Sequence, residues 1–534
     1  MTPRSARLLR VTAAVAAFAA IAALYRVALE TVPPYLAHDE VQLALNAQSV
    51  AASGRGMDGE WFPIFFSDRA LGEYGREPVS IYGTALVLKF LRDDEFAIRL
   101  ASVIVGLVNV ILMALVARRY FGSWPIGASA AALFAFTPIH FFLSRVGIEV
   151  IFVVPFVLAW LYFTFGSAVQ DYRRALASAA AAAAMLGFSV YAYKAAQLVA
   201  PAYLAMMLAF VFHQQRDRLG PQRARMIGVV AVAAFSIAVL PYALASREHP
   251  VRYRNFLRVY SIFDPSLSLL QNLRDVARYD SLADRISSYF ESFNPRLMFF
   301  KGEGAWSDST RTTGMFLLPA VIPIGVGVYA SVVRPSAARG FVLAGFLASP
   351  IPSFVLNEAV ARRMITVLPF ATLLAVEGFR ELRRRRFGTV AVAGVATAMG
   401  LHFALFYRDY LLRYPLNSFM AWELNQAEAF RHLANEDIAR GRRDKAMVLI
   451  ENPYAPDYAK LYLRKYGAVD LEQRITFLSL KPGPLEAVPD GPAIVVRQLF
   501  GGELPTEVCS SEWRIVAVVH EVVGNPSFVV CALK

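Results

Sequence analysis

Charged residues are scarce in this chain of 534 residues. Asp, Glu, Lys and Arg together make up 18% of it, whereas soluble globular proteins carry about 25%. Hydrophobic residues make up 57%, and several apolar runs reach the roughly 20 residues that cross the hydrocarbon core of a membrane. The scarcity of charge therefore excludes an ordinary soluble protein and predicts an integral membrane protein.

Cysteine is nearly absent as well. Cys509 and Cys531 are the only two, and both follow the last long apolar run, so the chain can form at most one internal disulfide. We expect these two residues to be bridged if their region faces an oxidising compartment.

The apolar runs predict about eleven transmembrane helices. The first run follows Arg4, Arg7 and Arg10, but its length and the lack of a persuasive cleavage site favour an uncleaved helix over a signal peptide. The predicted spans are residues 9–29, 97–117, 125–143, 149–167, 175–192, 196–212, 226–245, 313–333, 340–356, 364–379 and 388–407.

The net charge of +13 comes largely from short loops between alternate spans. This one-sided distribution indicates the cytoplasmic face of an inner (plasma) membrane, with the N-terminus on that face, and it argues against nucleic acid as the partner. The outer face then receives residues 30–96, residues 246–312 and the region from residue 408. The basic loops contain Arg118 and Arg119; Arg173 and Arg174; Arg216, Arg218, Arg223 and Arg225; Arg334 and Arg339; and Arg383 to Arg386.

The region after the last span has the pattern of a small soluble α/β domain. Helix-like stretches at 422–440 and 458–466 alternate with short strand-like runs, which lie at 447–450, 494–496, 515–519 and 528–530. We therefore expect a membrane domain over residues 1–410 and an extracytoplasmic domain over residues 411–534.

The most informative segment is the first outer one, residues 30–96, which contains Asp39 and Glu40. They precede apolar residues at helical spacing, which predicts an amphipathic helix lying at the membrane surface. Carboxylates at the start of a helix stabilise it through its dipole, so helix capping is one interpretation. The other is a general base at the lipid boundary, where partial desolvation raises the pKa of a carboxyl group.

Glu77 supplies another carboxylate in the same segment, between Arg76 and Pro78. It could help to orient an acceptor hydroxyl, although opposite charges before a proline are also typical of a solvated turn.

Arg145, Lys194, Arg362 and Arg363 lie at the outer ends of predicted helices. Such cations often extend to the membrane interface without further function, but these depart from the positive-inside pattern. A lipid phosphate, bound through charge-assisted hydrogen bonds, is the functional interpretation.

With Asp39-Glu40 after a first span, the Arg76-Glu77-Pro78 element and the stretch Phe142-Leu143-Ser144-Arg145-Val146-Gly147, the chain resembles the membrane glycosyltransferases of the GT-C fold. The likeness is greatest to the bacterial branch of family 39, the protein O-mannosyltransferase and aminoarabinose transferase family. It covers roughly residues 1–410. The aminoarabinose transferases carry Lys-Pro-Pro where Arg76-Glu77-Pro78 stands here, which leaves the substrate open but not the class.

The resemblance implies a polyprenyl-phosphate-linked sugar donor, an outer-face active site and an acid of the first outer segment as base, which corresponds to Asp39. It also implies a donor-side loop at Phe299-Phe300-Lys301-Gly302-Glu303-Gly304, with Arg311 and Gly314 downstream, where an ordinary outer loop is the alternative. The acceptor, whether lipid, polysaccharide or protein, stays open.

The expected reaction is a single displacement with inversion at the sugar. Asp39 accepts the proton of the acceptor hydroxyl, while Arg363, Lys194 or Arg145 stabilises the departing lipid phosphate. We expect no cofactor, because His38, Asp39 and Glu40 are adjacent and cannot easily converge on one divalent metal ion. A transporter or lipid flippase is the main alternative function, although such proteins usually place charges near the bilayer midplane.

Overall fold

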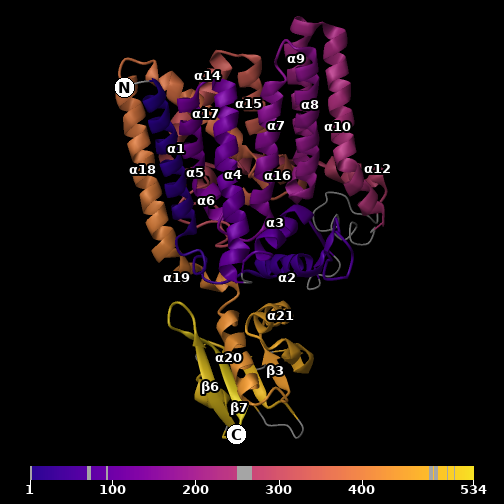
Figure 1. Cartoon of the computed structure of the whole chain (residues 1–534), viewed down its shortest axis with the longest axis vertical. Coiled ribbons are helices and arrows are strands. Elements are labelled where there is room, and N and C mark those ends of the chain that lie inside the picture. The colour runs from indigo at the N-terminus through magenta and orange to yellow at the C-terminus, as the bar shows by residue number, and fades with distance from the viewer. Residues whose placement is uncertain are drawn as a thin grey trace.

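The computed structural model describes residues 3–68, 74–91, 94–248, 267–479, 485, 491–501, 503–509 and 511–534. A bundle of long helices forms one part, and a small unit with a β-sheet lies below it, joined to the bundle at the end of α18 (Figure 1). The N-terminus lies at the end of the bundle that faces away from this small unit. The segments between the bundle and the small unit therefore lie at the end of the bundle opposite the N-terminus.

Each of the eleven predicted spans coincides with a helix or a pair of consecutive helices. The main helices of the bundle are α1 (Pro3–Arg26), α4 (Glu95–Phe121), α5 (Trp124–Ala135), α7 (Val154–Gly166), α8 (Tyr172–Phe188), α9 (Lys194–Leu219), α10 (Pro221–Glu248), α14 (Val321–Val333), α15 (Ala337–Ala348), α17 (Val367–Arg383) and α18 (Gly388–Leu412). Within the described residues, 7 helical segments are by themselves long and apolar enough to cross a membrane. The prediction of a polytopic helical membrane protein is confirmed.

Two predicted spans are interrupted by proline. The run at 125–143 divides into α5 and α6 (Pro138–Leu143), and the run at 340–356 divides into α15 and α16 (Ile351–Leu356), which follows Pro350. Proline has no backbone N–H to donate to the preceding turn, so each helix ends before it and restarts. Hydropathy alone does not register these breaks.

Glycine allows α14 and α17 to pack backbone against backbone. A Cβ atom at Gly327 would collide with the carbonyl of Leu374, and one at Gly378 would collide with the carbonyl of Pro323. Small residues at helix contacts are how membrane helices approach closely, because lipid provides no hydrophobic force between them.

The first outer segment forms a layer across the lower end of the bundle in Figure 1. It contains α2 (His38–Ser53), the antiparallel pair β1 (Phe66–Asp68) and β2 (Tyr74–Arg76), and α3 (Pro78–Leu88). The prediction of a helix is confirmed, whereas its position relative to a membrane surface stays a prediction. Residues 40–48 are all buried, because α3 covers one side of α2 and α21 of the small unit covers another.

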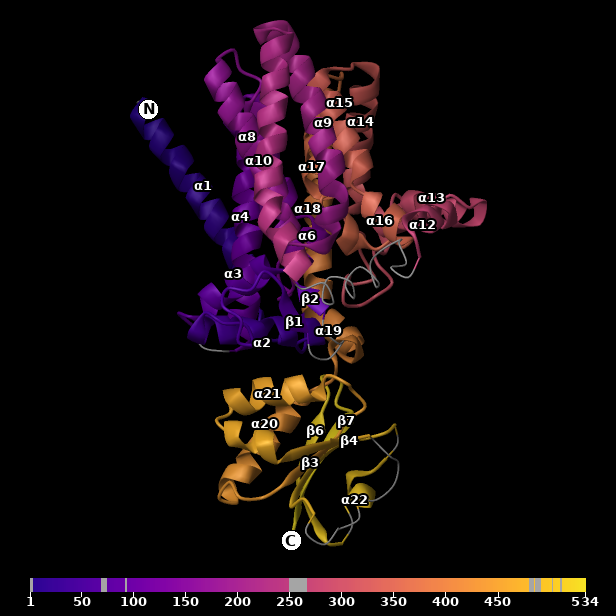
Figure 2. The same ribbon diagram turned by 90° about the vertical axis from the view of Figure 1, so that its right-hand side faces the viewer.

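The second outer segment runs out to the side of the bundle. α12 (Leu269–Val276) and α13 (Tyr279–Glu291) project away from the long helices near the ends that face the C-terminal unit (Figure 2), and α13 contacts α16. Short helical turns bring the chain back, namely η3 (Arg296–Phe300), η4 (Leu318–Ala320) and, later, η5 (Ala361–Met364).

The C-terminal unit is a five-stranded sheet in the order β4-β3-β5-β7-β6. The three strands β4, β3 and β5 are parallel, whereas β7 is antiparallel to both of its neighbours. α20 and α21 cover one face (Figure 2), so the predicted small α/β domain is confirmed. Its elements are α19 (Tyr414–Ser418), η6 (Phe419–Trp422), α20 (Gln426–Ala439), β3 (Ala446–Leu449), α21 (Ala455–Lys465), η7 (Val469–Arg474), β4 (Ile475–Leu478), β5 (Ile494–Gln498), α22 (Pro505–Val508), β6 (Trp513–His520) and β7 (Pro526–Leu533).

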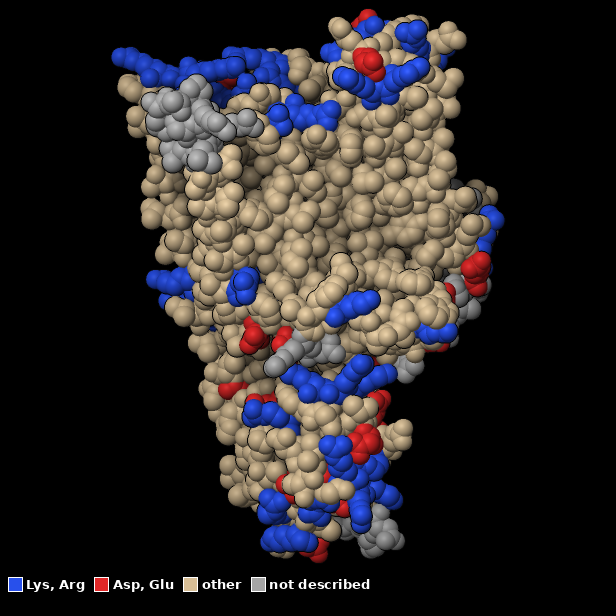
Figure 3. All heavy atoms as spheres, viewed as in Figure 1, with Lys and Arg blue, Asp and Glu red and all other residues tan. Residues whose placement is uncertain are grey.

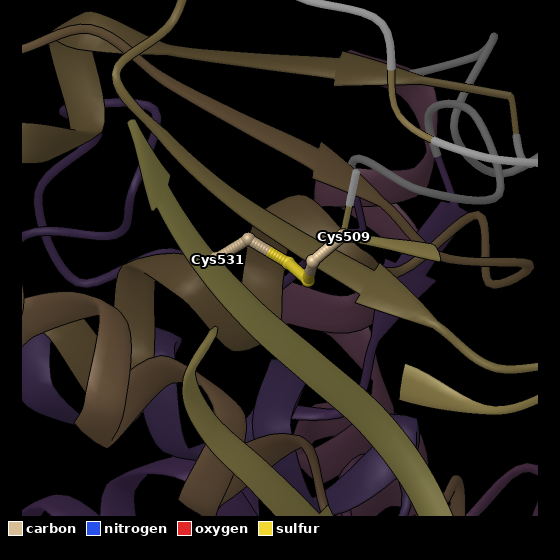
Figure 4. The surroundings of a disulfide bond; sticks show 2 residues. All are labelled: Cys509 and Cys531. Atoms are coloured by element: carbon tan, nitrogen blue, oxygen red, sulfur yellow. A yellow bond between two sulfur atoms is a disulfide. The ribbon is translucent and has the colours of Figure 1, made fainter. Parts of the chain in front are cut away.

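Cys509 and Cys531 form a disulfide, which joins the segment after α22 to β7 (Figure 4). The bridge closes a chain separation of 22 residues and packs among buried apolar side chains. Disulfides persist in oxidising compartments, so the bond is expected where the C-terminal unit faces such a compartment.

Charged side chains divide the surface into zones. In Figure 3, Lys and Arg gather at the end of the bundle that holds the N-terminus, a broad band without charge follows, and both signs mix over the C-terminal unit. This is the distribution that the basic loops predicted, and an apolar band between charged ends is what a membrane-spanning protein requires.

Candidate active site

Asp39 lies in the first turn of α2, at the end of the bundle that faces the C-terminal unit. Arg76, at the end of β2, donates a hydrogen bond of 2.6 Å from Nη2 to Oδ1 of Asp39, whose side chain is 38% exposed. Burial opposes ionisation of this carboxyl group, but the Arg76 guanidinium overcomes it and lowers the pKa of Asp39 to about 2. Asp39 is therefore an accessible carboxylate that is ionised at neutral pH.

Glu77 precedes Pro78, the first residue of α3, and its environment is the opposite of that of Asp39. The residue is only 3% exposed, and among the described residues its Oε2 has no hydrogen-bond partner. Burial raises the pKa of Glu77 to about 7, with Lys194 opposing and Glu149 reinforcing the shift. Two carboxyl groups of one segment are thus held at very different pKa values, an arrangement that is typical of acid–base sites.

Arg362 connects this pair of acids to the second outer segment. It belongs to η5 and forms an ion pair of 3.6 Å with Asp308, and the charges of Asp39 and Glu149 also act on it. Its side chain is 38% exposed, whereas Asp308 is buried. Burial raises the pKa of Asp308 even though Arg362 opposes the shift. Arg362 is accordingly a cation that acts on acidic groups of both outer segments.

Lys194 begins α9, and it lies close enough to Glu77 for its charge to lower the pKa of that residue. Glu149 begins the short helical turn η1 (Glu149–Val153) and acts on both Glu77 and Arg362. Asp39, Glu77, Glu149, Lys194, Asp308 and Arg362, together with Arg76, are hereafter called the charged cluster.

Arg363 pairs with a different acid, although it is adjacent to Arg362 in the sequence. Its guanidinium lies 2.6 Å from Glu358 Oε2, and that carboxylate is 55% exposed. The structure therefore favours Arg362 over Arg363 as the cation of the charged cluster, which reverses the emphasis of the sequence interpretation.

Glu40 is adjacent to Asp39 but cannot act as a base. It is fully buried, and Arg99 of α4 pairs with both of its oxygens at 3.0 and 3.1 Å. Its oxygens also accept hydrogen bonds from the backbone N–H of Gly147 and of Ala37. The expectation of a catalytic Glu40 is corrected, because its carboxylate is occupied and out of contact with solvent.

Arg145 is likewise not a free cation. It is fully buried and donates to the carbonyls of Tyr25, Ala28 and Val32 and to the Tyr410 hydroxyl. The accepting carbonyls belong to the last turn of α1 and to the segment that follows it. The expectation that Arg145 binds a lipid phosphate is corrected; it holds the chain that leads from α1 to Asp39.

The predicted donor-side loop borders the charged cluster through Glu303. This residue accepts a hydrogen bond of 2.9 Å from the backbone N–H of Ala361, the first residue of η5. Lys301 is exposed, and Arg311, at a positive φ of 58°, lies over the ring of Trp306. The loop thus contacts the segment that carries Arg362, but only Glu303 does so directly among its three predicted residues.

The cavity beneath this loop is nearly closed. Glu303, Asp308 and Ala361 are among the residues around a space of about 10 Å³, which is too small for a sugar. Gly302, at φ 70°, is one position of this loop where the backbone needs glycine.

The C-terminal unit reaches the same region through His38. Its Nδ1 lies 3.2 Å from Glu423 Oε1, and its ring stacks on Tyr454 with centroids 4.2 Å apart. Burial opposes protonation of His38, but the hydrogen bond with Glu423 and the charge of Asp39 raise its pKa. Asn452 donates to the other Glu423 oxygen at 2.8 Å. The residue next to Asp39 is thus held by the C-terminal unit.

Glu149, Asp308 and Glu423 were missed by the sequence interpretation. Glu149 had a weak signal, because it is an acid at the first residue of the predicted span 149–167. Asp308 and Glu423 had none, since each is an ordinary polar residue until the fold brings it beside Arg362 or His38. In the part of the chain that the structure describes, no group of three or more His, Cys, Asp or Glu side chains is arranged to hold a metal ion.

Comparisons with known proteins relate this arrangement to a fold and a family. Residues 76–242 match the family described as dolichyl-phosphate-mannose-protein mannosyltransferase. Among curated proteins, none matches the sequence.

Solved structures with the same fold include two of ArnT from Cupriavidus metallidurans. The one bound to undecaprenyl phosphate is 16% identical, with a TM-score of 0.57 and coverage of 97% of each chain. The apo form is 14% identical, with a TM-score of 0.55 and coverage of 98% of each chain.

The archaeal oligosaccharyltransferase AglB from Archaeoglobus fulgidus, in complex with an inhibitory peptide and a dolichol-phosphate, is 13% identical with a TM-score of 0.51. The match covers 86% of this chain and 64% of AglB. The chain therefore shares the fold of the membrane proteins ArnT and AglB, and its residues 76–242 resemble the dolichyl-phosphate-mannose-protein mannosyltransferase family.

Proposed function

We propose that the protein transfers a sugar from a polyprenyl-phosphate-linked donor to a hydroxyl acceptor at the outer face of an inner (plasma) membrane, with the N-terminus cytoplasmic. The observation that carries the proposal is the charged cluster at the end of the bundle opposite the basic loops. The ArnT structure bound to undecaprenyl phosphate supports the class of donor, since the two folds agree over nearly the whole chain. The acceptor is a lipid, a polysaccharide or a protein.

Asp39 is the proposed base. As the acceptor oxygen forms a bond to the anomeric carbon, its proton passes to the Asp39 carboxylate, and the bond between that carbon and the phosphate oxygen breaks. The electron pair of the broken bond leaves with the lipid phosphate, so one displacement inverts the configuration at the sugar. General-base catalysis contributes about 10² to 10⁴-fold, and alignment with electrostatic stabilisation supplies much of the rest.

Arg362 is the proposed cation for the departing phosphate, with Lys194 as the second. Arg362 is partly exposed and its ion pair with Asp308 is long at 3.6 Å, so a phosphate can compete for its guanidinium. Negative charge grows on the phosphate as the bond breaks, and a fixed cation therefore stabilises the transition state more than the bound donor. Lys301, Glu303 and Arg311 are proposed to cover the donor when the loop moves, and no metal ion or other cofactor is proposed.

The raised pKa of Glu77 gives it a separate part in the proposal. Because it is buried beside Lys194, its charge state sets the net charge around the donor phosphate. A neutral Glu77 leaves Lys194 more attractive to an anion. Glu77 is thus proposed as a positioning residue rather than a second base.

A transporter or flippase was the alternative, and neither the family match nor the fold supports it. The test is transfer by the purified protein in detergent micelles, with a polyprenyl-phosphate sugar as donor and membrane extract as acceptor source. Mass spectrometry of surface glycolipids and glycans, with and without the protein in the cell, identifies the sugar and the acceptor. If the surface glycans are unchanged and the purified protein releases no lipid phosphate from any such donor, the proposal fails.

A further inference from the structure

A long groove runs along α18, between that helix, α5 and α17. Its volume is about 920 Å³, within the range of roughly 300–1,000 Å³ that ligand pockets occupy. Side chains of α5, α17 and α18 line most of it. Apolar residues dominate, and the charged ones, Arg380, Arg383 and Arg384, lie together on the last turns of α17 and just after it.

Small side chains create the groove. Ser129 and Ala132 of α5 face Ala396 and Gly400 of α18 across it. A Cβ atom at Gly400 would have nothing within 4 Å, so this glycine does not serve a close helix contact. Membrane helices usually use small residues to approach each other, whereas here they leave space open.

The length of the groove matches one leaflet of a bilayer. Its lining on α18 extends from Val392 to Phe403, which corresponds to about 17 Å at 1.5 Å per residue. Half of a hydrocarbon core of about 30 Å is about 15 Å. An acyl chain of one leaflet fits this length, whereas a polyprenyl chain is far longer.

The arginines provide an uncompensated positive charge at one end. Arg380 pairs with Glu377 at 3.1 Å and Arg384 with Glu381 at 3.1 Å. The same two carboxylates also bind Arg339 and Arg334. Among the described residues Arg383 has no ion pair, and it is exposed at the mouth of the groove. An anionic group is therefore the partner that this end attracts.

We propose that the groove binds a diacyl phospholipid with an anionic headgroup, drawn from the leaflet on the side of the basic loops. The phosphate contacts Arg383, with Arg380 and Arg384 beside it, and an acyl chain lies along the face of α18 that carries Ala396 and Gly400. Basic pockets between helices on the cytoplasmic side are known lipid headgroup sites, and apolar burial adds to the attraction. Because α18 continues into α19, the bound lipid would also steady the helix that leads to the C-terminal unit.

The test measures binding of dioleoyl phosphatidylglycerol to the purified full-length protein by native mass spectrometry, with dioleoyl phosphatidylcholine as the zwitterionic comparison. We expect a preference for phosphatidylglycerol, which the double variant Arg383→Ala/Arg384→Ala reduces by at least about fivefold. Arg385→Ala/Arg386→Ala is the matched control, because it removes the same charge from residues outside the groove lining.

Two further measurements distinguish a bound phospholipid from a free phosphate and control for misfolding of the variants. Gly400→Leu fills the apolar part without changing any charge, and it should lower phosphatidylglycerol binding in a protein that keeps its thermal stability. Glycerol phosphate, which lacks acyl chains, should not compete. Equal losses in both double variants, or unchanged binding in Gly400→Leu, would each overturn the proposal.

Discussion

Arg76 donates a hydrogen bond of 2.6 Å to Asp39, and this contact gives Asp39 a different pKa from Glu77, the other acid of the first outer segment. The guanidinium keeps Asp39 ionised with a pKa of about 2, while Glu77, the next residue after Arg76, is buried and titrates near pH 7.

Replacement of Arg76 should move the pH dependence of transfer. In the Arg76→Gln variant the cation that lowers the pKa of Asp39 is gone, so the acid limb of kcat/KM should shift to higher pH by at least about one unit. The measurement is a pH profile of kcat/KM for both proteins. Arg55→Gln, which removes a cation that lies over Trp61 in the same segment, is the control and should leave the limb in place.

Glu77 should make the protein less stable as pH rises. Its pKa in the folded state, about 7, exceeds the ordinary value of 4.5 in an unfolded chain, so its contribution to stability is fully present below pH 4.5 and is lost as the pH rises through 7. Glu77→Gln should remove this loss, and the variant should gain stability over wild type above pH 7. Thermal unfolding in detergent between pH 5 and 8 tests it; parallel curves for the two proteins would contradict the raised pKa.

Asp39→Asn should fold and insert normally but lose transfer activity by about 10²-fold or more, because an amide keeps the shape and cannot accept a proton. Steady-state rates at saturating donor provide the measurement. Asp94→Asn is the matched control, since Asp94 caps α4 through Ala97 N–H and asparagine caps equally well. Activity within a few-fold of wild type would leave Asp39 as a helix-start residue only.

Replacement of Arg362 and replacement of Arg363, the two neighbouring arginines of η5, should affect donor use to different extents. Arg362→Ala should reduce donor use strongly, Arg362→Lys should recover part of it, and Arg363→Ala should have a smaller effect because Arg363 pairs with an exposed Glu358. Rates at limiting donor decide the order. Equal losses in the two alanine variants would mean that the structure does not separate their roles.

Glu40→Gln should destabilise the protein rather than change its chemistry. The substitution leaves Arg99 buried without its charged partner, at a cost of about 3–5 kcal/mol. Thermal unfolding should show the loss, whereas KM for the donor in the folded fraction should stay close to wild type. A selective rise in KM with normal stability would instead return Glu40 to the site.

Sequence alone determined the class of protein and most of its helices. Hydropathy is a local property, so residues 97–117 and 388–407 predicted α4 and α18 without knowledge of any neighbour. The small α/β unit was also readable, because alternating apolar strands such as residues 494–496 and 528–530 carry their own periodicity. The position of Asp39 and Glu40 at the start of a helix was likewise predictable from the local sequence.

Only the tertiary structure decided which charged residues are free to act. Glu40 and Asp39 are neighbours in sequence, yet Arg99, 59 residues away from Glu40, occupies the first and leaves the second accessible. Arg362 and Arg363 are separated in the same way by Asp308 and Glu358. The role that a charged residue can take depends on its ion-pair partners and on its burial. Both are set by segments that are far apart in the chain. No local sequence pattern could therefore distinguish one member of each pair from the other.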